Sequence, residues 1–257
     1  MNTQQQIVAY QTMVVKEVSR FMRIWIQTLL PPAISMTLYF VIFGNLIGSR
    51  IGEMGGLTYM QYIAPGIIMM SIINNAYANV VSSFFGAKFQ KHIEEMLVSP
   101  IPNYLILAGY ITGGVTRGLL VGLIVSIVAL FFTELNIYSY PLMISVVLLT
   151  SILFSLGGMI NGIFAKKFDD ISIIPTFILT PLTYLGGVFY SIDLLPDFWQ
   201  KVSMFNPILY MVNTFRYGML GVSDINVTYA FSIIGIFVVG LSLFCLYLLN
   251  RGVGIKA

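Results

Sequence analysis

Few side chains in this sequence could support bond-making chemistry. The chain has one histidine, His92, and one cysteine, Cys245, which excludes paired-histidine metal sites, thiolate metal clusters and an intramolecular disulfide framework. It has neither a GxSxG nucleophile elbow nor the GxxxxGK[ST] loop that cradles the phosphates of ATP. Asp169 and Asp170 follow two lysines in a loop and do not suit an intramembrane aspartyl protease. We therefore expect no catalytic residue, no metal site and no cofactor held by this chain.

The remaining polar side chains of interest follow helical spacing in two apolar segments. They are Ser71, Asn75 and Asn79, followed by Ser82, in the first segment, and Thr176, Thr180 and Thr183 in the second. Such faces must point into protein or into a water-filled path, because hydrocarbon offers no hydrogen-bond partner. Hydrogen bonds between helices, worth about 0.6 kcal/mol each, are common in membrane bundles. The spacing favours packing, and a role in lining a substrate path stays open.

Arg117 is a further candidate because it is the one charge inside an apolar run. A charge at that depth costs about 2.5–3.5 kcal/mol on insertion scales and tends to be functional. Its positive charge could suit an anionic substrate. The alternative is a span that starts later, with Arg117 reaching back towards the cytoplasm. Gly114, Gly118 and Gly122 recur around it every four residues and predict a surface for close helix packing.

These residues must be positioned by membrane-spanning helices. The chain is 58% hydrophobic and only 9% charged, against about 25% charged residues in soluble domains. We predict a single all-α integral membrane domain over residues 1–257, with six transmembrane helices of about 20 or more mostly apolar residues. The six segments are 25–48, 61–85, 104–132, 139–165, 171–192 and 227–250. Pro31-Pro32 in the first, and Pro175 and Pro181 in the fifth, predict kinks.

Basic residues in the loops predict the orientation. An even number of spans places both termini on one side, and the side with more Lys and Arg is cytoplasmic. The terminal side carries Lys16, Arg20, Arg23, Lys88, Lys91, Lys166, Lys167, Arg251 and Lys256, and the opposite side carries Arg50, Lys201 and Arg216. Both termini are therefore expected in the cytoplasm.

Two segments outside the spans have their own patterns. In residues 1–24 and the start of the first span, Val14, Val18, Phe21 and Trp25 share one helical face, which predicts an amphipathic interfacial helix. A simple basic extension of the first span is the alternative. Residues 193–226 are apolar but interrupted, and predict a re-entrant hairpin of two short helices on the outer side.

The cytoplasmic loop of residues 86–100 predicts a short amphipathic helix. Phe85, Phe89, Ile93 and Met96 or Leu97 align on one face, with Glu94, Glu95 and lysines elsewhere, and Pro100 and Pro102 end the helix. Apolar knobs with charges of both signs could enter a groove on a partner protein. A helix resting on the lipid surface fits the spacing equally well.

The energy source for transport is missing from this chain. No acidic residue lies within a span, where gradient-driven transporters place the groups that bind the coupling ion. A moving membrane domain without its own energy input implies a separate motor subunit. The loop residues Phe89, Ile93, Glu94, Glu95 and Met96 are the candidates for coupling to it. Passive channels, however, also lack both an acidic residue within a span and a phosphate-binding loop.

Several motifs in order give the chain its resemblance to a known family. They are Tyr62-Ile63-Ala64-Pro65-Gly66, Glu94-Glu95-Met96-Leu97-Val98-Ser99-Pro100, Pro181-Leu182-Thr183-Tyr184-Leu185-Gly186-Gly187-Val188-Phe189-Tyr190-Ser191, Leu195-Pro196, Asn206-Pro207 and Tyr210. Over nearly its whole length the chain resembles the permease subunits of ABC-2 type (type V) ABC transporters.

The resemblance implies a homodimer in the bacterial inner membrane, seated on two copies of a cytoplasmic ABC ATPase that bind ATP and Mg. It also implies that residues 86–100 form the coupling helix, with Glu94 and Glu95 in the matching motif. Spans two and five would line the path of the exported substrate. Lipids, polysaccharides, lipid-linked glycans and drugs are substrates of the family.

Two other functions compete with an ATP-driven exporter. A stand-alone channel or carrier would need no partner, and a membrane enzyme acting on lipid would need a catalytic pair that the sequence does not offer. A nucleic-acid partner is not expected, because the net charge is only +3. Membrane lipid is the other expected contact.

Overall fold

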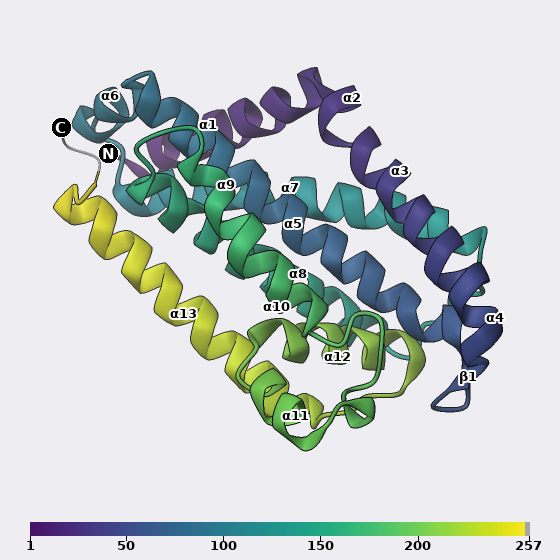
Figure 1. Cartoon of the computed structure of the whole chain (residues 1–257). Coiled ribbons are helices and arrows are strands. Elements are labelled where there is room, and N and C mark those ends of the chain that lie inside the picture. Colours follow the sequence, from purple (N-terminus) through teal and green to yellow (C-terminus); the bar gives the residue numbers. More distant parts are fainter. Residues whose placement is uncertain (255–257) are drawn as a thin grey trace.

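The computed structural model describes residues 1–254 and shows a bundle of helices (Figure 1). Within these residues, five helical stretches are long and apolar enough to cross a membrane: Trp25–Ile51, α5 (Tyr59–Phe89), α7 (Asn103–Leu130), α8 (Tyr140–Phe164) and α13 (Val227–Arg251). Each end lies within four residues of the end predicted from sequence. The all-α membrane class is confirmed.

The first of these stretches is built of several pieces. They are α2 (Trp25–Thr28), α3 (Leu30–Tyr39), the π-helical segment η1 (Phe40–Ile47) and α4 (Gly48–Ile51). Pro31 and Pro32 lie in the first turn of α3, where a missing backbone N–H costs no helical hydrogen bond. A two-stranded hairpin, β1 (Glu53–Met54) and β2 (Leu57–Thr58), then leads into α5.

Helix α5 is the centre of the bundle, and α7 and α8 pack against it. The glycines of α7 allow this close approach: a Cβ at Gly118 would lie 3.1 Å from the Cβ of Ala76, and one at Gly122 would lie 2.7 Å from Cγ1 of Ile72. The packing surface predicted from the glycine spacing is confirmed. By contrast, the stretch Trp25–Ile51 and helix α13 are mostly exposed in the single chain, so they face lipid or another protein.

The predicted fifth span is not one long helix. It consists of α9 (Asp170–Ile174), the π-helical η2 (Pro175–Leu179) and α10 (Thr180–Tyr184), three pieces of five residues each. Together they reach about 22 Å, short of the roughly 30 Å of hydrocarbon. Gly187, with φ of +70°, turns the chain soon afterwards. The count of six spans is therefore not confirmed among the described residues.

The segment expected as an outer hairpin forms a compact helical cluster at one end of the bundle. It contains the 3-10 turn η3 (Ile192–Leu194), α11 (Asp197–Ser203) and α12 (Pro207–Leu220). The side chain of Asn206 accepts a hydrogen bond from the N–H of Ile208, capping α12 just before Pro207. Figure 1 shows this cluster at the opposite end from α6 (His92–Val98) and from both labelled termini.

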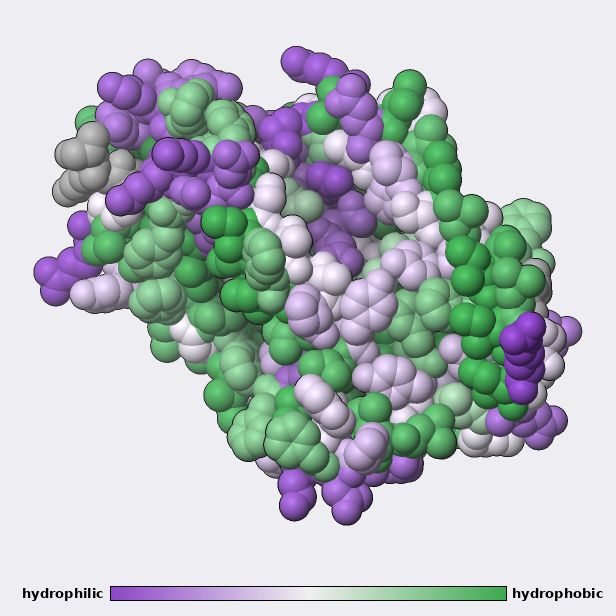
Figure 2. Space-filling model, in the orientation of Figure 1, coloured by the Kyte–Doolittle hydropathy of each residue, from purple (hydrophilic) through white to green (hydrophobic). Residues whose placement is uncertain are grey.

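Helix α1 (Thr3–Arg23) lies across the end of the bundle that carries the termini, at a steep angle to α3 (Figure 1). On the face shown in Figure 2, hydrophilic residues gather at the two ends of the molecule and hydrophobic residues cover the flanks of the middle, which a hollow with hydrophilic residues interrupts. This distribution suits a protein whose middle lies in lipid. Lys256, counted above with the cytoplasmic basic residues, lies outside the described residues.

Candidate functional site

Helix α1 is packed on α7 as an integral part of the subunit. A Cβ at Gly109 would lie 2.7 Å from the Cβ of Met13, and one at Gly113 would lie 2.6 Å from the Cβ of Glu17. The buried residues of α1 are Met13, Glu17 and Phe21, spaced four apart. The face predicted from sequence is partly wrong, because the helix turns Glu17 inward and leaves Trp25 exposed. The absence of side chains at Gly109 and Gly113 of α7 makes this close approach possible.

A group of charged and amide side chains lies beneath α1, between α1, α5 and α7. Glu17 is fully buried, and its Oε1 accepts a hydrogen bond of 2.8 Å from the Ser83 hydroxyl. Its Oε2 lies 3.6 Å from Nε of Arg20. Nη2 of Arg20 in turn donates to the Asn79 side-chain oxygen at 2.8 Å and to the Asn79 backbone oxygen at 3.0 Å. Such partners offset the cost of burying a carboxylate.

Arg117 joins this group from the middle of α7. Its Nη2 donates to the side-chain oxygen of Asn75 at 3.1 Å and to the backbone oxygen of Thr28, at the end of α2, at 3.3 Å. The guanidinium therefore points into the subunit, towards α5 and the corner between α2 and α3. We call Glu17, Arg20, Asn75, Asn79, Ser83 and Arg117 the inner polar cluster.

The polar residues predicted at helical spacing have different environments. Ser71, Asn75 and Asn79 are buried inside the subunit, and the hydroxyl of Ser71 donates to a backbone oxygen of its own helix. Thr183 is buried in the same manner, whereas Thr176 and Thr180 are exposed. Inter-helix hydrogen bonding, which the spacing favoured, thus describes Asn75 and Asn79. A path-lining role for any of these residues stays a prediction.

The apolar loop residues predicted to couple to a motor, Phe89, Ile93 and Met96, do not share one face. Lys91 has a φ of +63°, which breaks the helix, so α5 continues to Phe89 and α6 begins at His92. The continuous amphipathic helix expected over residues 86–100 is therefore wrong. Ile93 is fully buried against the bundle and Met96 is half-buried, while Glu94 and Glu95 are exposed.

An exposed apolar surface nevertheless exists beside α6. The side chain of Phe89 is 60% exposed, Phe168 in the loop before α9 is 57% exposed, and Val98 is 87% exposed. The rings of Phe89 and Phe168 make an edge contact with centroids 4.9 Å apart. The α6 surface, defined as Phe89, Glu94, Glu95, Val98 and Phe168, thus combines apolar and acidic side chains, and the exposed Lys91 and Lys167 border it. Sequence analysis missed Phe168 and Val98, because neither falls on the predicted helical face.

The opposite end of the bundle holds a second buried charge, Arg216 of α12. Its Nε donates to the Tyr62 backbone oxygen at 3.2 Å, its Nη2 to that of Gly187 at 2.6 Å, and its Nη1 to the side chain of Asn213 at 3.3 Å. The guanidinium lies 4.0 Å from the Tyr62 ring centroid, and Nη1 lies 4.0 Å from Oδ2 of Asp224. Arg216 was expected in an outer loop. It is instead fully buried because each part of its side chain finds a partner.

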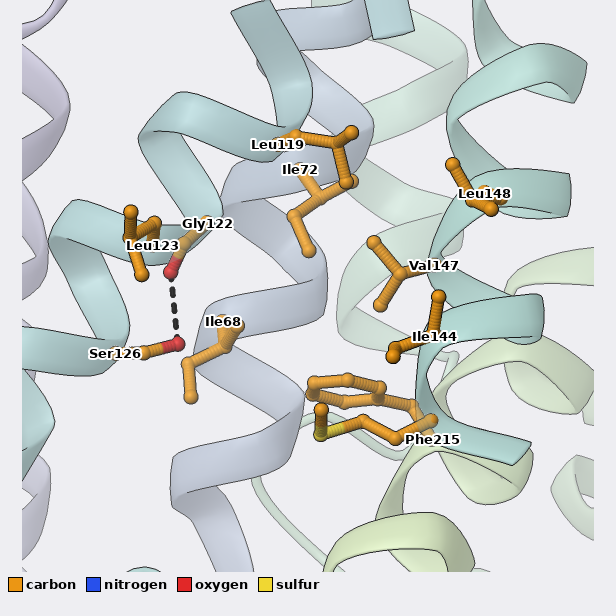
Figure 3. Close-up of a pocket in the computed structure, with 11 residues that line it drawn as sticks. Ile68, Ile72, Leu119, Gly122, Leu123, Ser126, Ile144, Val147, Leu148 and Phe215 are labelled. Atoms are coloured by element: carbon orange, nitrogen blue, oxygen red, sulfur yellow. Dashed lines mark hydrogen bonds between the residues drawn. The ribbon is translucent and has the colours of Figure 1, made fainter. Parts of the chain in front are cut away.

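An apolar cavity of about 240 Å³ lies between α5, α7, α8 and α12 (Figure 3). Ile68 and Ile72 form its floor, and Leu123 and Ile144 on its rim are exposed. The hydroxyl of Ser126 donates to the backbone oxygen of Gly122 at 2.8 Å, so this hydroxyl is already satisfied (Figure 3). The cavity offers apolar contacts and little to orient a polar substrate.

Comparison with known proteins accounts for this architecture. A family model described as "ABC-2 type transporter" matches residues 8–220. The chain belongs to the ABC-2 type transporter family. Inner membrane transport permease YadH of Escherichia coli strain K12 is 58% identical over 250 residues, covering 97% of this chain and 98% of the relative.

More distant relatives are the Nodulation protein J sequences of rhizobia. That of Rhizobium leguminosarum bv. viciae is 26% identical over 203 residues, covering 79% of this chain and 78% of the relative. That of Rhizobium meliloti strain 1021 is 23% identical over 187 residues, covering 72% and 71%. The chain is thus an ABC-2 transport permease, a multi-pass protein of the inner membrane and a non-enzymatic membrane subunit. Membership of this family implies an ATP-binding partner.

Proposed function

We propose that this permease forms the substrate path of an ATP-driven exporter as a homodimer, with two copies of a cytoplasmic ABC ATPase supplying the energy. ATP and Mg would be bound by the ATPase, since this chain has no phosphate-cradling loop. The substrate would be a lipid, a glycan or polysaccharide, or an amphipathic drug. The observation that carries the proposal is the α6 surface, an apolar and acidic projection at the end where both termini lie.

The α6 surface suits a protein partner better than water. Val98 and Phe89 would expose apolar area to solvent, and clusters of such residues mark interaction sites. Glu94 and Glu95 would place negative charge at the rim, where it selects a partner with basic residues around an apolar groove. Both termini and α6 would then face the cytoplasm.

A partly exposed strip along α5 supports a substrate path at a dimer interface. Its members recur every four residues: Met70, Asn74, Ala78, Ser82 and Gly86. In Figure 1, α3 lies on one side of α5, and α9 and α10 lie on the other. Thr176 and Thr180 are exposed on η2 and α10. We propose that this strip and these threonines line the path, while Ser71, Asn75, Asn79 and Thr183 support it from within.

The path would be closed towards the outside by aromatic side chains. The Tyr39 and Tyr184 hydroxyls lie 3.4 Å apart, joining α3 to α10. Phe43 stacks on Phe189 with ring centroids 4.6 Å apart, and Tyr39 and Tyr184 both pack on Phe189. We further propose that α9, η2 and α10 complete a sixth crossing together with residues 185–195, which α12 covers from the outer leaflet. Helix α1 would lie in the inner interface.

The docking of the ATPase can be tested with single substitutions on the α6 surface. Val98→Asp and Phe168→Asp should prevent co-purification of a protein that carries the GxxxxGK[ST] loop and hydrolyses ATP. Val253→Asp, at an exposed apolar residue of the C-terminal end, is the matched control and should retain it. Ile93 is unsuitable as a probe because its side chain is buried in the subunit.

Unchanged co-purification of the ATPase with both α6 variants would refute the docking assignment. Transport by the purified permease alone in liposomes, without ATP or a partner, would refute the exporter and favour a stand-alone carrier. Comparing exported lipids and glycans in cells with and without the gene would then narrow the substrate class.

A further inference from the structure

The inner polar cluster carries more positive charge than the subunit neutralises. It contains two guanidinium groups, Arg20 and Arg117, and one carboxylate, Glu17. Glu17 is paired with Arg20 at 3.6 Å, and Lys16 at the cluster's exposed edge lies 4.0 Å from the same carboxyl group. Among residues 1–254, no carboxylate lies within ion-pair distance of Arg117. A buried positive charge without a counter-charge is costly, and a bound anion would remove that cost.

The two guanidinium groups are held by residues one helical turn apart. Arg20 donates to Asn79 and Arg117 donates to Asn75, which are neighbours one turn apart on the same face of α5. Side chains at this spacing lie about 6 Å apart. An oxyanion with oxygens on several sides, such as a phosphate group, can accept hydrogen bonds from both groups across that gap.

Two residues of the cluster also carry open hydrogen-bond donors. Nδ2 of Asn79 and Nε of Arg117 are buried and have no acceptor among residues 1–254, whereas Nε of Arg20 is directed at Glu17. Asn79 is fully buried, so its free amide cannot be satisfied by bulk water. The Tyr110 hydroxyl, also buried without a partner, adds a donor, and Oε2 of Glu17 is the one acceptor that would oppose an anion there. Donors outnumber acceptors, as an oxyanion requires.

The surroundings of the cluster point to a lipid as the source of the anion. Arg20 keeps 31% of its side chain exposed, and Figure 2 shows a hollow with hydrophilic residues at its base below the α1–α2 corner. Trp25 and Ile26 of α2, next to the Thr28 carbonyl that holds Arg117, are exposed and apolar. A phospholipid presents a phosphate group and apolar chains together, which matches this combination.

We propose that the inner polar cluster binds the phosphate group of a membrane phospholipid between Arg20 and Arg117, with Asn79 donating a further hydrogen bond. The bound lipid would tie α1 to α5 and α7. The proposal rests on residues of this chain alone and stands whether or not an ATPase docks on α6.

The test is lipid binding by the purified full-length protein. Delipidated protein is titrated with dioleoylphosphatidylglycerol, and bound lipid is counted by native mass spectrometry. Dioleoylglycerol, which lacks the phosphate, and inorganic phosphate alone are the comparison ligands. We expect one tightly held phospholipid per chain and little retention of dioleoylglycerol. Arg20→Gln and Arg117→Gln should each weaken phospholipid binding about 10- to 100-fold, the loss expected for a charge-assisted hydrogen bond.

Two further variants separate anion binding from a structural role. Arg23→Gln removes an exposed positive charge from the same helix and should leave binding unchanged. Asn79→Asp is nearly isosteric and places the missing negative charge beside Arg20. It should abolish phospholipid binding while leaving the thermal unfolding temperature of the protein the same or higher. The Asn79→Asp variant therefore still tests the anion site if either arginine variant fails to fold.

Wild-type phospholipid affinity in both arginine variants, or in Asn79→Asp, would overturn the proposal. Equal retention of dioleoylglycerol and phosphatidylglycerol would overturn it too, because the phosphate would then not be recognised. Saturation by inorganic phosphate that displaces the lipid would support the anion site and overturn its assignment to a lipid.

Discussion

Replacing Arg216 by Met should destabilise the protein more than substitution of any single exposed residue. Met keeps most of the side-chain volume but removes the charge and all the donors. The substitution leaves Gly187 and Asn213 without the hydrogen bonds at 2.6 and 3.3 Å and leaves Asp224 without its positive partner. Tyr62 loses a cation–π contact at 4.0 Å.

The size of the effect follows from these contacts. Removing one partner of a buried charge pair costs about 3–5 kcal/mol, and the free energy of unfolding should fall by that amount. For a chain of this length, about 2–4 °C of unfolding temperature corresponds to each kcal/mol. The midpoint should therefore fall by roughly 6–20 °C.

The protein contains its own reporter for this measurement. Cys245 is the one cysteine in the sequence, and its side chain is buried between α13 and α8. A thiol-reactive fluorescent dye should therefore react only as the protein unfolds. Lys201→Met, which removes an exposed charge from the same outer segment, is the control. A melting midpoint for Arg216→Met within about 1 °C of this control would refute the reasoning, because it would mean that the network contributes almost nothing.

Three other predictions follow from local structure. Gly158→Ala would place a Cβ 2.5 Å from a backbone oxygen of α5 and should destabilise the bundle by about 1–3 kcal/mol in the same thiol assay. Gly235→Ala, with no atom within 4 Å of the added Cβ, should instead stabilise α13 by up to about 1 kcal/mol. The backbone N–H groups of Lys166 and Lys167 hold the pKa of Asp170 below its ordinary value of 3.8. Protection of these amides from hydrogen exchange should therefore be complete above that pH and fall as pH drops through the lowered pKa. Asp170→Asn should have reduced protection above that pH and should lack this pH-dependent fall. Unchanged exchange in Asp170→Asn would contradict this.

The long spans were predictable because their signal depends only on composition and length. A run of about 20 apolar residues can satisfy its backbone in lipid only as a helix, so helices α5, α7, α8 and α13 begin and end close to the predicted residues. The prediction of one long helix over residues 171–192 was not confirmed. The hydropathy of this segment predicts that it is buried in lipid or protein, but Pro175 and Pro181 interrupt the regular α-helix.

The buried charges were harder to predict, because a single sequence does not show which helix covers which. Arg216 reads as a surface residue until α12 is seen to fold back over Tyr62 and Gly187. Glu17 could have been found, since it lies four residues from both Met13 and Phe21 and so shares their buried face. The apolar coupling residues Phe89, Ile93 and Met96 were placed on one face because a continuous helix was assumed. The left-handed backbone at Lys91 rotates α6 and buries Ile93.

The two buried charge networks imply different behaviour at the two ends of the subunit. Arg216 has a carboxylate and three oxygen acceptors, so its network is complete and should stay rigid. The inner polar cluster is incomplete, so its stability should depend on a bound anion. Helix α1 carries Arg20 on one side, and on another it borders α6 across a cavity of about 570 Å³ lined by Lys16 and Glu95.

Binding of phosphatidylglycerol at the cluster should therefore slow hydrogen exchange in α1 and also in α6, although no residue of α6 belongs to the cluster. The effect should disappear in Asn79→Asp, whose cluster is neutral without a ligand, and persist in Arg23→Gln. Exchange in α6 that does not change while α1 is protected would show that the two helices move independently. Lipid occupancy could then not be transmitted to the α6 surface through α1.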